Sequence, residues 1–188
     1  IGRYAFRGCT GLKNITTGNG VTSLSGFEFE EGYDYSNLTS ITIGDRVAII
    51  GDNAFSECTN LNEIKVGNGV ISIGNNAFHG TPWYESCPEG DLYIGKVYYE
   101  YRGEMPEKTK ITIKEGTATI EDKAFADCAQ LIDIVIPESV KDIGDSAFFN
   151  CSNLTSITFP SGLTNIGEYA FDNCIKLSNI KIPDSVTK

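Results

Sequence analysis

The sequence predicts a solenoid of α/β to mostly β structure, in which the chain winds into about eight stacked turns of 23 residues. Three observations predict this fold. Seven pairs of alanine and phenylalanine, or their equivalents, recur along the chain. Phe125, Phe148 and Phe171 are spaced by 23 residues, and the apolar residues between the pairs return at fixed places. Such self-similarity is typical of a chain in which each unit buries its apolar face only against its neighbours.

Each unit is expected to contribute one strand to a parallel β-sheet on one face of the stack. In the clearest copy, Leu154, Ile157 and Phe159 end in a period-two step, so that the residues between them point to the opposite face. Pro160 should end this strand, because proline donates no hydrogen bond to a sheet.

The other face of each unit should hold a short strand and a single helical turn. In the same copy, residues 163–166 form a second short extended piece that meets Gly167, and glycine adopts a positive φ at a tight bend most readily. The Ala-Phe-x-x-Cys stretch is too short for a stable α-helix, and we expect one helical turn there.

Stacking should bring equivalent side chains into columns with a step of about 4.8 Å. One column is expected to hold phenylalanines and another leucines: Phe6, Phe55, Phe78, Phe125, Phe148 and Phe171, and Leu12, Leu38, Leu61, Leu131, Leu154 and Leu177. Two units depart from the template. Glu28-Phe29 replaces the usual pair in a unit of 26 residues, and the interval from Ile73 to Ile120 is 47 residues, close to two units, so that one unit there is rebuilt.

The rebuilt unit, residues 80–107, predicts a β-hairpin insertion rich in aromatic residues. Leu92-Tyr93-Ile94 and Val97-Tyr98-Tyr99 flank Gly95-Lys96, a two-residue link suited to a hairpin turn. Aromatic rings with polar tips suit protein interfaces and stacking on sugars, although the same rings could simply cover the side of the solenoid. The candidate binding residues of the insertion are Trp83, Tyr84, Tyr93, Tyr98, Tyr99 and Tyr101.

The pattern Ile-Gly-x-x-Ala-Phe-x-x-Cys-x-x-Leu-x-x-Ile-x-Ile-Pro resembles the BspA-like class of leucine-rich repeats, which occurs in bacterial surface proteins. The resemblance covers nearly the whole chain, and the insertion also resembles one common in that family. It implies a leucine-rich-repeat solenoid, an extracellular or bacterial cell-surface location, and adhesion to matrix components or other cells.

The composition excludes some classes of protein. The net charge of −10 disfavours nucleic-acid binding, which normally needs a clustered basic surface. No apolar run approaches the roughly 20 residues of a transmembrane segment, and no signal peptide is present in this chain. We expect residues 1–188 to form a single elongated domain that is a piece of a longer chain, because the first and last residues fall inside the template.

The cysteines are expected to be core residues. Five of the six occupy one slot of the repeat, so their side chains should run parallel along the stack rather than converge as a disulfide requires. Cys87 lies alone in the insertion and could be a reactive thiol. No spacing typical of a metal site is present, and we expect neither a metal nor a cofactor.

The exposed face of the main sheet is the first candidate for binding an extracellular protein or glycan, because solenoids use such extended surfaces. Its side chains are short and polar or of mixed charge, a composition that strand propensity alone could also explain. We call this surface the ladder face, and its predicted residues are Asn14, Thr16, Ser40, Thr42, Glu63, Lys65, Lys110, Thr112, Asp133, Val135, Ser156, Thr158, Asn179 and Lys181.

An acidic segment and the single histidine carry less chemistry. Residues 27–35 hold four acids in seven positions and could bind calcium, but the ordered spacing of an EF-hand loop is lacking, which favours a solvated loop. His79 stands without a nucleophile motif or a phosphate loop, so we expect no enzyme activity.

The sequence therefore favours a non-catalytic recognition module of a secreted or cell-surface bacterial protein that acts in adhesion or cell interaction. The alternative is a structural spacer that displays a catalytic or carbohydrate-binding domain of the parent protein. A third interpretation is direct glycan binding at Trp83, Tyr84 and Tyr99.

Overall fold

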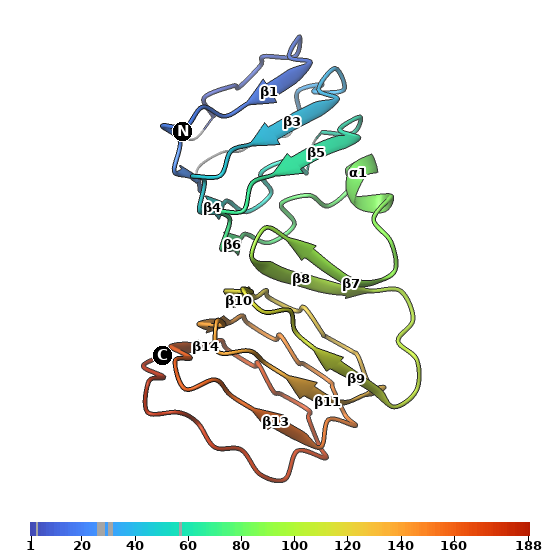
Figure 1. The fold of residues 1–188 in the computed structure, drawn as a ribbon. Helices are drawn as coiled ribbons and strands as arrows, with labels where there is room; N and C mark the ends of the chain where they lie inside the picture. Colours follow the sequence, from blue (N-terminus) through green and yellow to red (C-terminus); the bar gives the residue numbers. More distant parts are fainter. Residues whose placement is uncertain (3, 26–28, 30–31, 57) are drawn as a thin grey trace. The chain divides into compact units, whose positions relative to one another are not determined.

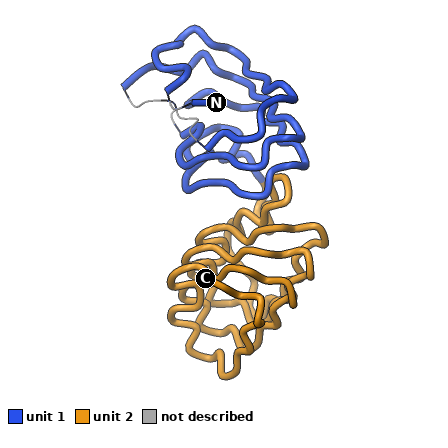
Figure 2. The backbone as a smooth tube through the Cα atoms, turned by 90° about the vertical axis from the view of Figure 1, so that its left-hand side faces the viewer, with its two compact units in different colours: residues 1–87 blue, residues 88–188 orange. Residues whose placement is uncertain are grey.

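The computed structural model describes residues 1–188 except residues 3, 26–28, 30–31 and 57. The chain forms two compact units, Ile1–Cys87 and Pro88–Lys188, which Figure 2 shows in blue and orange. Each unit is a β-solenoid with two sheets, as predicted. The expectation that residues 1–188 form a single domain stays a prediction.

Unit 1 contains two three-stranded parallel sheets (Figure 1). The main sheet holds β1 (Asn14–Thr16), β3 (Ser40–Ile43) and β5 (Glu63–Val66) in that order. The second sheet holds β2 (Ser23–Leu24), β4 (Ile49–Ile50) and β6 (Ser72–Ile73), and α1 (Pro82–Glu85) follows it. Sequential strands alternate between the two sheets, which is the winding expected of a solenoid.

Unit 2 repeats this arrangement and adds the insertion. Its main sheet has the order β13 (Ser156–Thr158), β11 (Leu131–Val135) and β9 (Thr109–Thr112). Its second sheet holds β14 (Asn165–Ile166), β12 (Asp142–Ile143), β10 (Thr119–Ile120), β8 (Val97–Arg102) and β7 (Gly90–Ile94). The strands β7 and β8 form the predicted antiparallel hairpin around Gly95-Lys96, and β8 pairs in parallel with β10.

Among the described residues, six turns carry a strand in each sheet, rather than the eight expected. The hairpin accounts for one difference, because β8 occupies the place beside β10 that a regular turn would supply. The final stretch, residues 167–188, accounts for the other, because it contains no strand.

The Ala-Phe corner is a series of turns instead of the expected helical turn. The residue before each alanine has a positive φ, as at Asn53 (52°) and Ser146 (55°), which an α-helix does not permit. This conformation directs backbone N–H groups along the stack, so that the amide of Phe125 donates to the carbonyl of Ala147 (2.8 Å) and the amide of Phe148 to that of Ala170 (2.8 Å). The corner therefore satisfies its backbone both between turns and within one, as where the amide of Cys151 donates to the carbonyl of Phe148 (3.1 Å).

The core of each unit is a column of stacked aromatic rings. In unit 2, Phe148 lies between Phe125 and Phe171 with both ring centroids 5.1 Å away and interplanar angles of 9° and 6°. Tyr98 of the insertion continues this column, 4.5 Å from the ring of Phe125. In unit 1, Phe55 stacks on Phe78 at 5.6 Å. The predicted phenylalanine column is confirmed at these positions, with a tyrosine that the template did not include.

Polar side chains also form columns that join successive turns. The Asp122 carboxylate accepts from the backbone amide of Asp145 (2.7 Å), and the Asp145 carboxylate accepts from the amide of Glu168 (2.7 Å). The Asn153 amide donates to the carbonyl of Ala129 (2.6 Å). These bonds satisfy backbone groups at the corners, where no strand pairing is available.

Replacing Phe148 by alanine should lower the free energy of unfolding by about 3–5 kcal/mol, because it empties the middle of the ring column. Tyr169→Ala is the matched control, since that ring is 69% exposed, and it should change the free energy by less than about 0.5 kcal/mol. Urea denaturation followed by far-ultraviolet circular dichroism measures both values. Equal midpoints for the two variants would show that the column does not stabilise the unit.

Candidate functional site

The ladder face has the predicted register in unit 1. The cross-strand rows are Asn14–Ser40–Glu63 and Thr16–Thr42–Lys65, all on the outward side of the main sheet. Neighbouring side chains interact, as in the hydrogen bond that the Ser40 hydroxyl donates to the Asn14 side-chain oxygen (2.6 Å). The face is therefore a flat surface of short polar groups rather than a pocket.

The ladder face of unit 2 has the same construction. Its rows are Lys110–Asp133–Ser156 and Thr112–Val135–Thr158. Asp133 accepts from Lys110 (3.5 Å) and from the Ser156 hydroxyl (3.1 Å). Val135 is 54% exposed, so an apolar side chain lies in the middle of the polar face.

The remaining two predicted ladder residues lie outside the sheet. Asn179 and Lys181 are exposed, but residues 179–182 form no strand and do not pair with β13. The apolar residues between them, Ile180 and Ile182, are 44% and 55% exposed, so this segment gains little burial that would hold it in the sheet.

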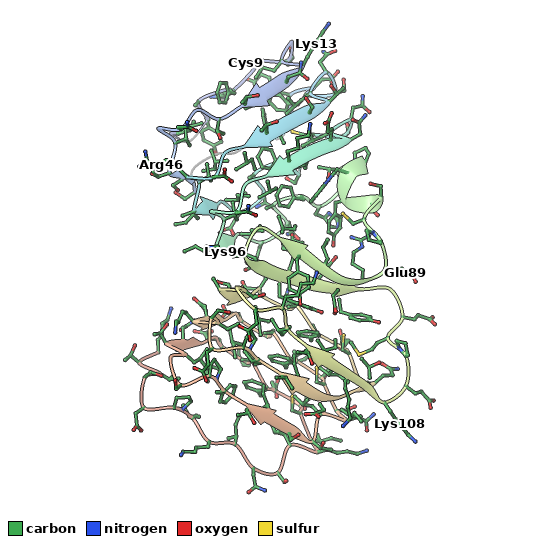
Figure 3. All side chains as sticks on the ribbon, viewed as in Figure 1. Cys9, Lys13, Arg46, Glu89, Lys96 and Lys108 are labelled. Carbon is green, nitrogen blue, oxygen red and sulfur yellow. The ribbon has the colours of Figure 1, made fainter. Side chains whose placement is uncertain are left out.

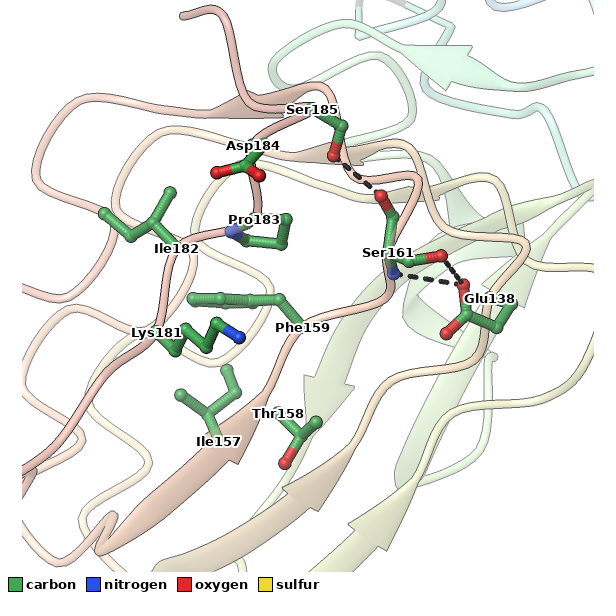
Figure 4. A pocket seen from close by; sticks show the side chains of 10 residues that line it. All are labelled: Glu138, Ile157, Thr158, Phe159, Ser161, Lys181, Ile182, Pro183, Asp184 and Ser185. Atoms are coloured by element: carbon green, nitrogen blue, oxygen red, sulfur yellow. Dashed lines mark hydrogen bonds between the residues drawn. The ribbon is translucent and has the colours of Figure 1, made fainter.

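A hollow of about 530 Å³ separates this segment from β13 (Figure 4). The ring of Phe159 projects into it, between Ile182 on one side and the pair formed by Ser161 and Glu138 on the other. The Glu138 carboxylate accepts from both the backbone amide and the hydroxyl of Ser161 (3.0 and 2.9 Å). The hollow thus lies beside the ladder face, at the point where the sheet ends.

Charged pairs on the ladder face are weak. Lys65 and Glu63 lie 2.8 Å apart on the same strand, and the hydrogen bond to Glu63 raises the pKa of the Lys65 ammonium. Both side chains are largely exposed, and exposed pairs contribute little to stability. These groups remain accessible to a partner.

The insertion places its aromatic residues in two different environments. Tyr98 and Tyr99 are buried, and Tyr98 belongs to the ring column, so these two rings serve the core rather than an exposed surface. The Tyr98 hydroxyl donates to Asp91 (2.8 Å), and burial followed by the Asp91 charge raises the pKa of Tyr98 well above its usual value. Tyr93 and Tyr101 are half-buried.

Two further contacts hold Tyr93 at the surface. The Lys114 ammonium lies 4.1 Å from the centroid of the ring, a cation–π contact, and the Tyr93 hydroxyl accepts from the Lys114 backbone amide (3.1 Å). Burial raises the pKa of Tyr93. One face of this ring is therefore already occupied by a residue of the chain itself.

Trp83 and Tyr84 lie on α1 in unit 1. Thr81 caps this helix by accepting from the Tyr84 backbone amide (3.2 Å). Trp83 packs edge-on against Phe78, with centroids 5.2 Å apart, and is half-buried. The exposed His79 lies 6.3 Å from the ring of Tyr84. The tryptophan thus adds to the ring column and leaves only part of its surface for a ligand.

Three of the four acids of the acidic segment, at positions 28, 30 and 31, lie outside the described residues. In its described part, Asp34 accepts from the Ser36 backbone amide (2.9 Å), and the hydrogen bonds to Ser36 lower the pKa of Asp34. Within the described ranges, no group of three or more histidine, cysteine or acidic residues is arranged to hold a metal ion.

All six cysteines are free thiols. The Cys151 thiol donates to the carbonyl of Phe125 and the Cys174 thiol to that of Phe148, each at 3.1 Å, so the column follows the stack as expected. Burial raises the pKa of Cys151 and of Cys174, and it raises the pKa of Cys128 to about 11. Cys9 is exposed and Cys87 is half-buried.

Two further hollows lie in unit 2, and neither was predicted from the repeat. One of about 470 Å³ lies between the return of the insertion and the first regular corner, and one of about 500 Å³ lies beside it, where Gln130 lines both. The repeat template offered no signal for them, because they arise where the chain departs from it.

None of the helices that the structure describes is long and apolar enough to span a bilayer.

The chain is similar to a known family of repeat proteins and to solved structures. The profile of a family described as BspA type leucine rich repeat region matches residues 1–87 and 94–188, in six copies. No curated protein was found to match the sequence. A solved leucine rich cell surface protein from Faecalibacterium prausnitzii A2-165 is 33% identical, with a TM-score of 0.51, and the match covers 97% of this chain and 51% of that one.

A second solved structure, the pneumococcal vaccine antigen PcpA, is 19% identical with a TM-score of 0.51. The match covers 93% of this chain and 49% of PcpA, and at this identity it shows the fold alone. The chain spans about half the length of these two solved proteins.

Thiol labelling should divide the cysteines by burial. With Ellman's reagent at pH 8, Cys9 should react at once, whereas the buried Cys58, Cys151 and Cys174 should react only after denaturant is added, because the thiolate is the reactive form and burial disfavours it. The Cys9→Ser variant should lose the fast phase. Immediate reaction of the buried thiols in the native protein would contradict the packed column.

Unit 2 should lose stability as the pH rises above about 10, the pKa of tyrosine in an unfolded chain. Because the folded state raises the pKa of Tyr98, its contribution to stability is complete below that pH and is lost above it. Urea unfolding at pH 8–11 should show a steeper fall for the native protein than for Tyr98→Phe, in which this group no longer titrates. Parallel pH curves would contradict the expected role of Tyr98.

Proposed function

The chain belongs to the BspA-type leucine-rich-repeat family, and from this membership we propose that it is a non-catalytic recognition module of a bacterial surface or secreted protein. Its ladder face binds an extracellular protein in adhesion or cell interaction. The observation that carries this proposal is the register of the ladder face, which aligns short polar side chains in rows across the strands of each unit.

The geometry of this face suits a macromolecule better than a small molecule. The rows are exposed and flat, and solenoids bind partners along such extended surfaces. Thr112, Val135 and Thr158 form a row in which an apolar centre lies between two hydroxyl-bearing side chains. A protein interface commonly combines an apolar centre with a polar rim in this way.

The non-catalytic role is supported by the environment of the charged groups on the face. Acid–base catalysis needs a group whose pKa is tuned in a site that excludes water. The charged side chains of the ladder face are instead largely exposed and pair with neighbours, as Lys65 does with Glu63 and Lys110 with Asp133.

The surface location is supported by the relative from Faecalibacterium prausnitzii, which is described as a cell surface protein. The chain spans about half of that protein. A full-length protein of that size can therefore have binding surfaces in addition to the ladder face. A spacer that displays another domain is the competing role, and the following experiment separates the two.

Surface plasmon resonance against immobilised fibronectin, laminin, type I collagen and fibrinogen tests the ladder face. The double variant Thr112→Arg/Thr158→Arg should weaken binding at least about tenfold, because two long charged side chains obstruct one row of the face. Thr59→Arg, an equally exposed threonine outside the ladder face, should bind as the native protein does. Failure to bind any of the four proteins, or equal binding by both variants, would favour the spacer.

A further inference from the structure

Two hollows of unit 2 share Gln130 in their linings, and together we call them the corner groove. Both hollows, of about 470 and 500 Å³, fall in the size range of small-ligand sites, about 300–1,000 Å³. The first is lined by Tyr101, Gly103, Glu104, Met105, Ala126, Asp127, Cys128 and Gln130, and the second by Glu107, Lys108, Gln130, Ile132, Asn153, Thr155 and Lys176.

The groove exists because the insertion returns to the main sheet by a different path from a regular turn. A regular corner closes tightly, as where the amide of Leu154 donates to the carbonyl of Cys151 (3.0 Å). Residues 103–108 instead form a loop that bends through positive φ at Gly103 (75°) and Lys108 (59°). Figure 3 shows Lys108 at the outer edge of unit 2, where this loop meets β9. The loop lies beside the first regular corner and leaves the hollows between them.

The exposed side-chain amide of Gln130 is a hydrogen-bonding group of the corner groove that the stack does not use. Gln130, Asn153 and Lys176 occupy equivalent positions, 23 residues apart. Asn153 donates to the Ala129 carbonyl (2.6 Å) and accepts from the Lys176 ammonium (2.6 Å), so both the nitrogen and the oxygen of its amide have a partner in the stack. The Gln130 side-chain amide has no partner among the residues that the structure describes, because the insertion stands where the previous turn would lie.

The lining of the groove combines apolar surface with groups of both charges. Tyr101 and Ile132 are half-buried, and each contributes apolar surface to one of the hollows. Two acidic side chains, Glu104 and Asp127, line the first hollow. The second hollow is lined by one acidic side chain, Glu107, and by the ammonium groups of Lys108 and Lys176. An anionic polymer would be repelled by three carboxylates here, and because two ammonium groups lie beside them, the lining has a net charge of only −1 to attract a cationic ligand.

The walls of the corner groove present side chains to a ligand, whereas the backbone groups of the adjoining strands are already hydrogen-bonded. The Thr109 amide donates to the Gln130 carbonyl (3.0 Å), and the Thr155 amide donates to that of Ile132 (3.1 Å), so the strand edges at the groove are already paired with each other. An extended peptide that binds by adding a strand would need such groups to be open. This disfavours a peptide as the ligand.

We propose that the corner groove binds a neutral oligosaccharide. Sugar hydroxyls both donate and accept, so they can use the carboxylates, the ammonium groups and the Gln130 amide together. The apolar face of a sugar ring can pack on Tyr101 and Ile132. This site is separate from the ladder face and does not depend on the protein partner proposed for it.

Gln130 provides the direct test, because it is the single glutamine of the chain and its side-chain amide signal is identified as the one missing from the spectrum of Gln130→Ala. The 188-residue protein, labelled with ¹⁵N, is titrated separately with cellotetraose, maltotetraose, mannotetraose and N-acetylated chitotetraose. At least one of them should shift the Gln130 side-chain signals saturably. Absence of such a shift with all four, or shifts only with the anionic polymers alginate and hyaluronan, would overturn the proposal.

Two pairs of variants then locate the binding. Gln130→Ala should raise the dissociation constant about tenfold, the effect of losing one or two hydrogen bonds. Lys108→Gly should raise it as well, whereas Lys123→Gly should not. Lys123 is exposed and has the same φ of 59°, so glycine relieves the same backbone conformation at both positions and only the groove contact differs. Equal affinity of both lysine variants together with unchanged binding by Gln130→Ala would overturn the site.

Discussion

The structure depends on one constraint: each turn must satisfy its backbone and bury its apolar face against the next turn. At the corners this is achieved by amides that point along the stack, as from Phe125 to the Ala147 carbonyl. In the core it is achieved by rings that stack at 5.1 Å. Both spacings are close to the step between parallel strands, about 4.8 Å, so sheet, corner and core advance together. Equivalent side chains therefore form columns whatever their chemistry.

This constraint determines where function can lie. Inward columns are occupied by phenylalanine, leucine and cysteine, and their repetition reflects packing alone. Outward columns can vary without cost to the stack, so the ladder face is available for recognition. The insertion satisfies the same constraint by other means, since β8 pairs with β10 and Tyr98 supplies the ring that stacks on Phe125. The loop that leaves β8 is released from the template, and the corner groove forms there.

The repeat predicted some elements in detail and others incorrectly. It predicted the register of the ladder rows, the hairpin at Gly95-Lys96 and the thiol column, because each follows from a period or from a two-residue turn. It did not predict the positive φ before each alanine, because a single turn considered alone gives no sign of the bonds that its corner also makes to the next turn. It also treated Tyr98 as a surface candidate, since a ring inside an insertion has no template position to indicate its burial.

The sequence by itself determined the period, the identity of the columns and the family, because these depend only on which residue types return after 23 positions. Which departures from the period matter follows only from how the turns pack. Residues 179–182 follow the strand pattern yet lie outside the sheet, while Gln130 occupies an ordinary template position yet has a free amide. Residues 179–182 gain little burial beside β13, and Gln130 lies beside the insertion instead of a regular turn. The state of a residue in a stack depends on the turn beside it, and that neighbour is set by the path of the chain rather than by the local pattern.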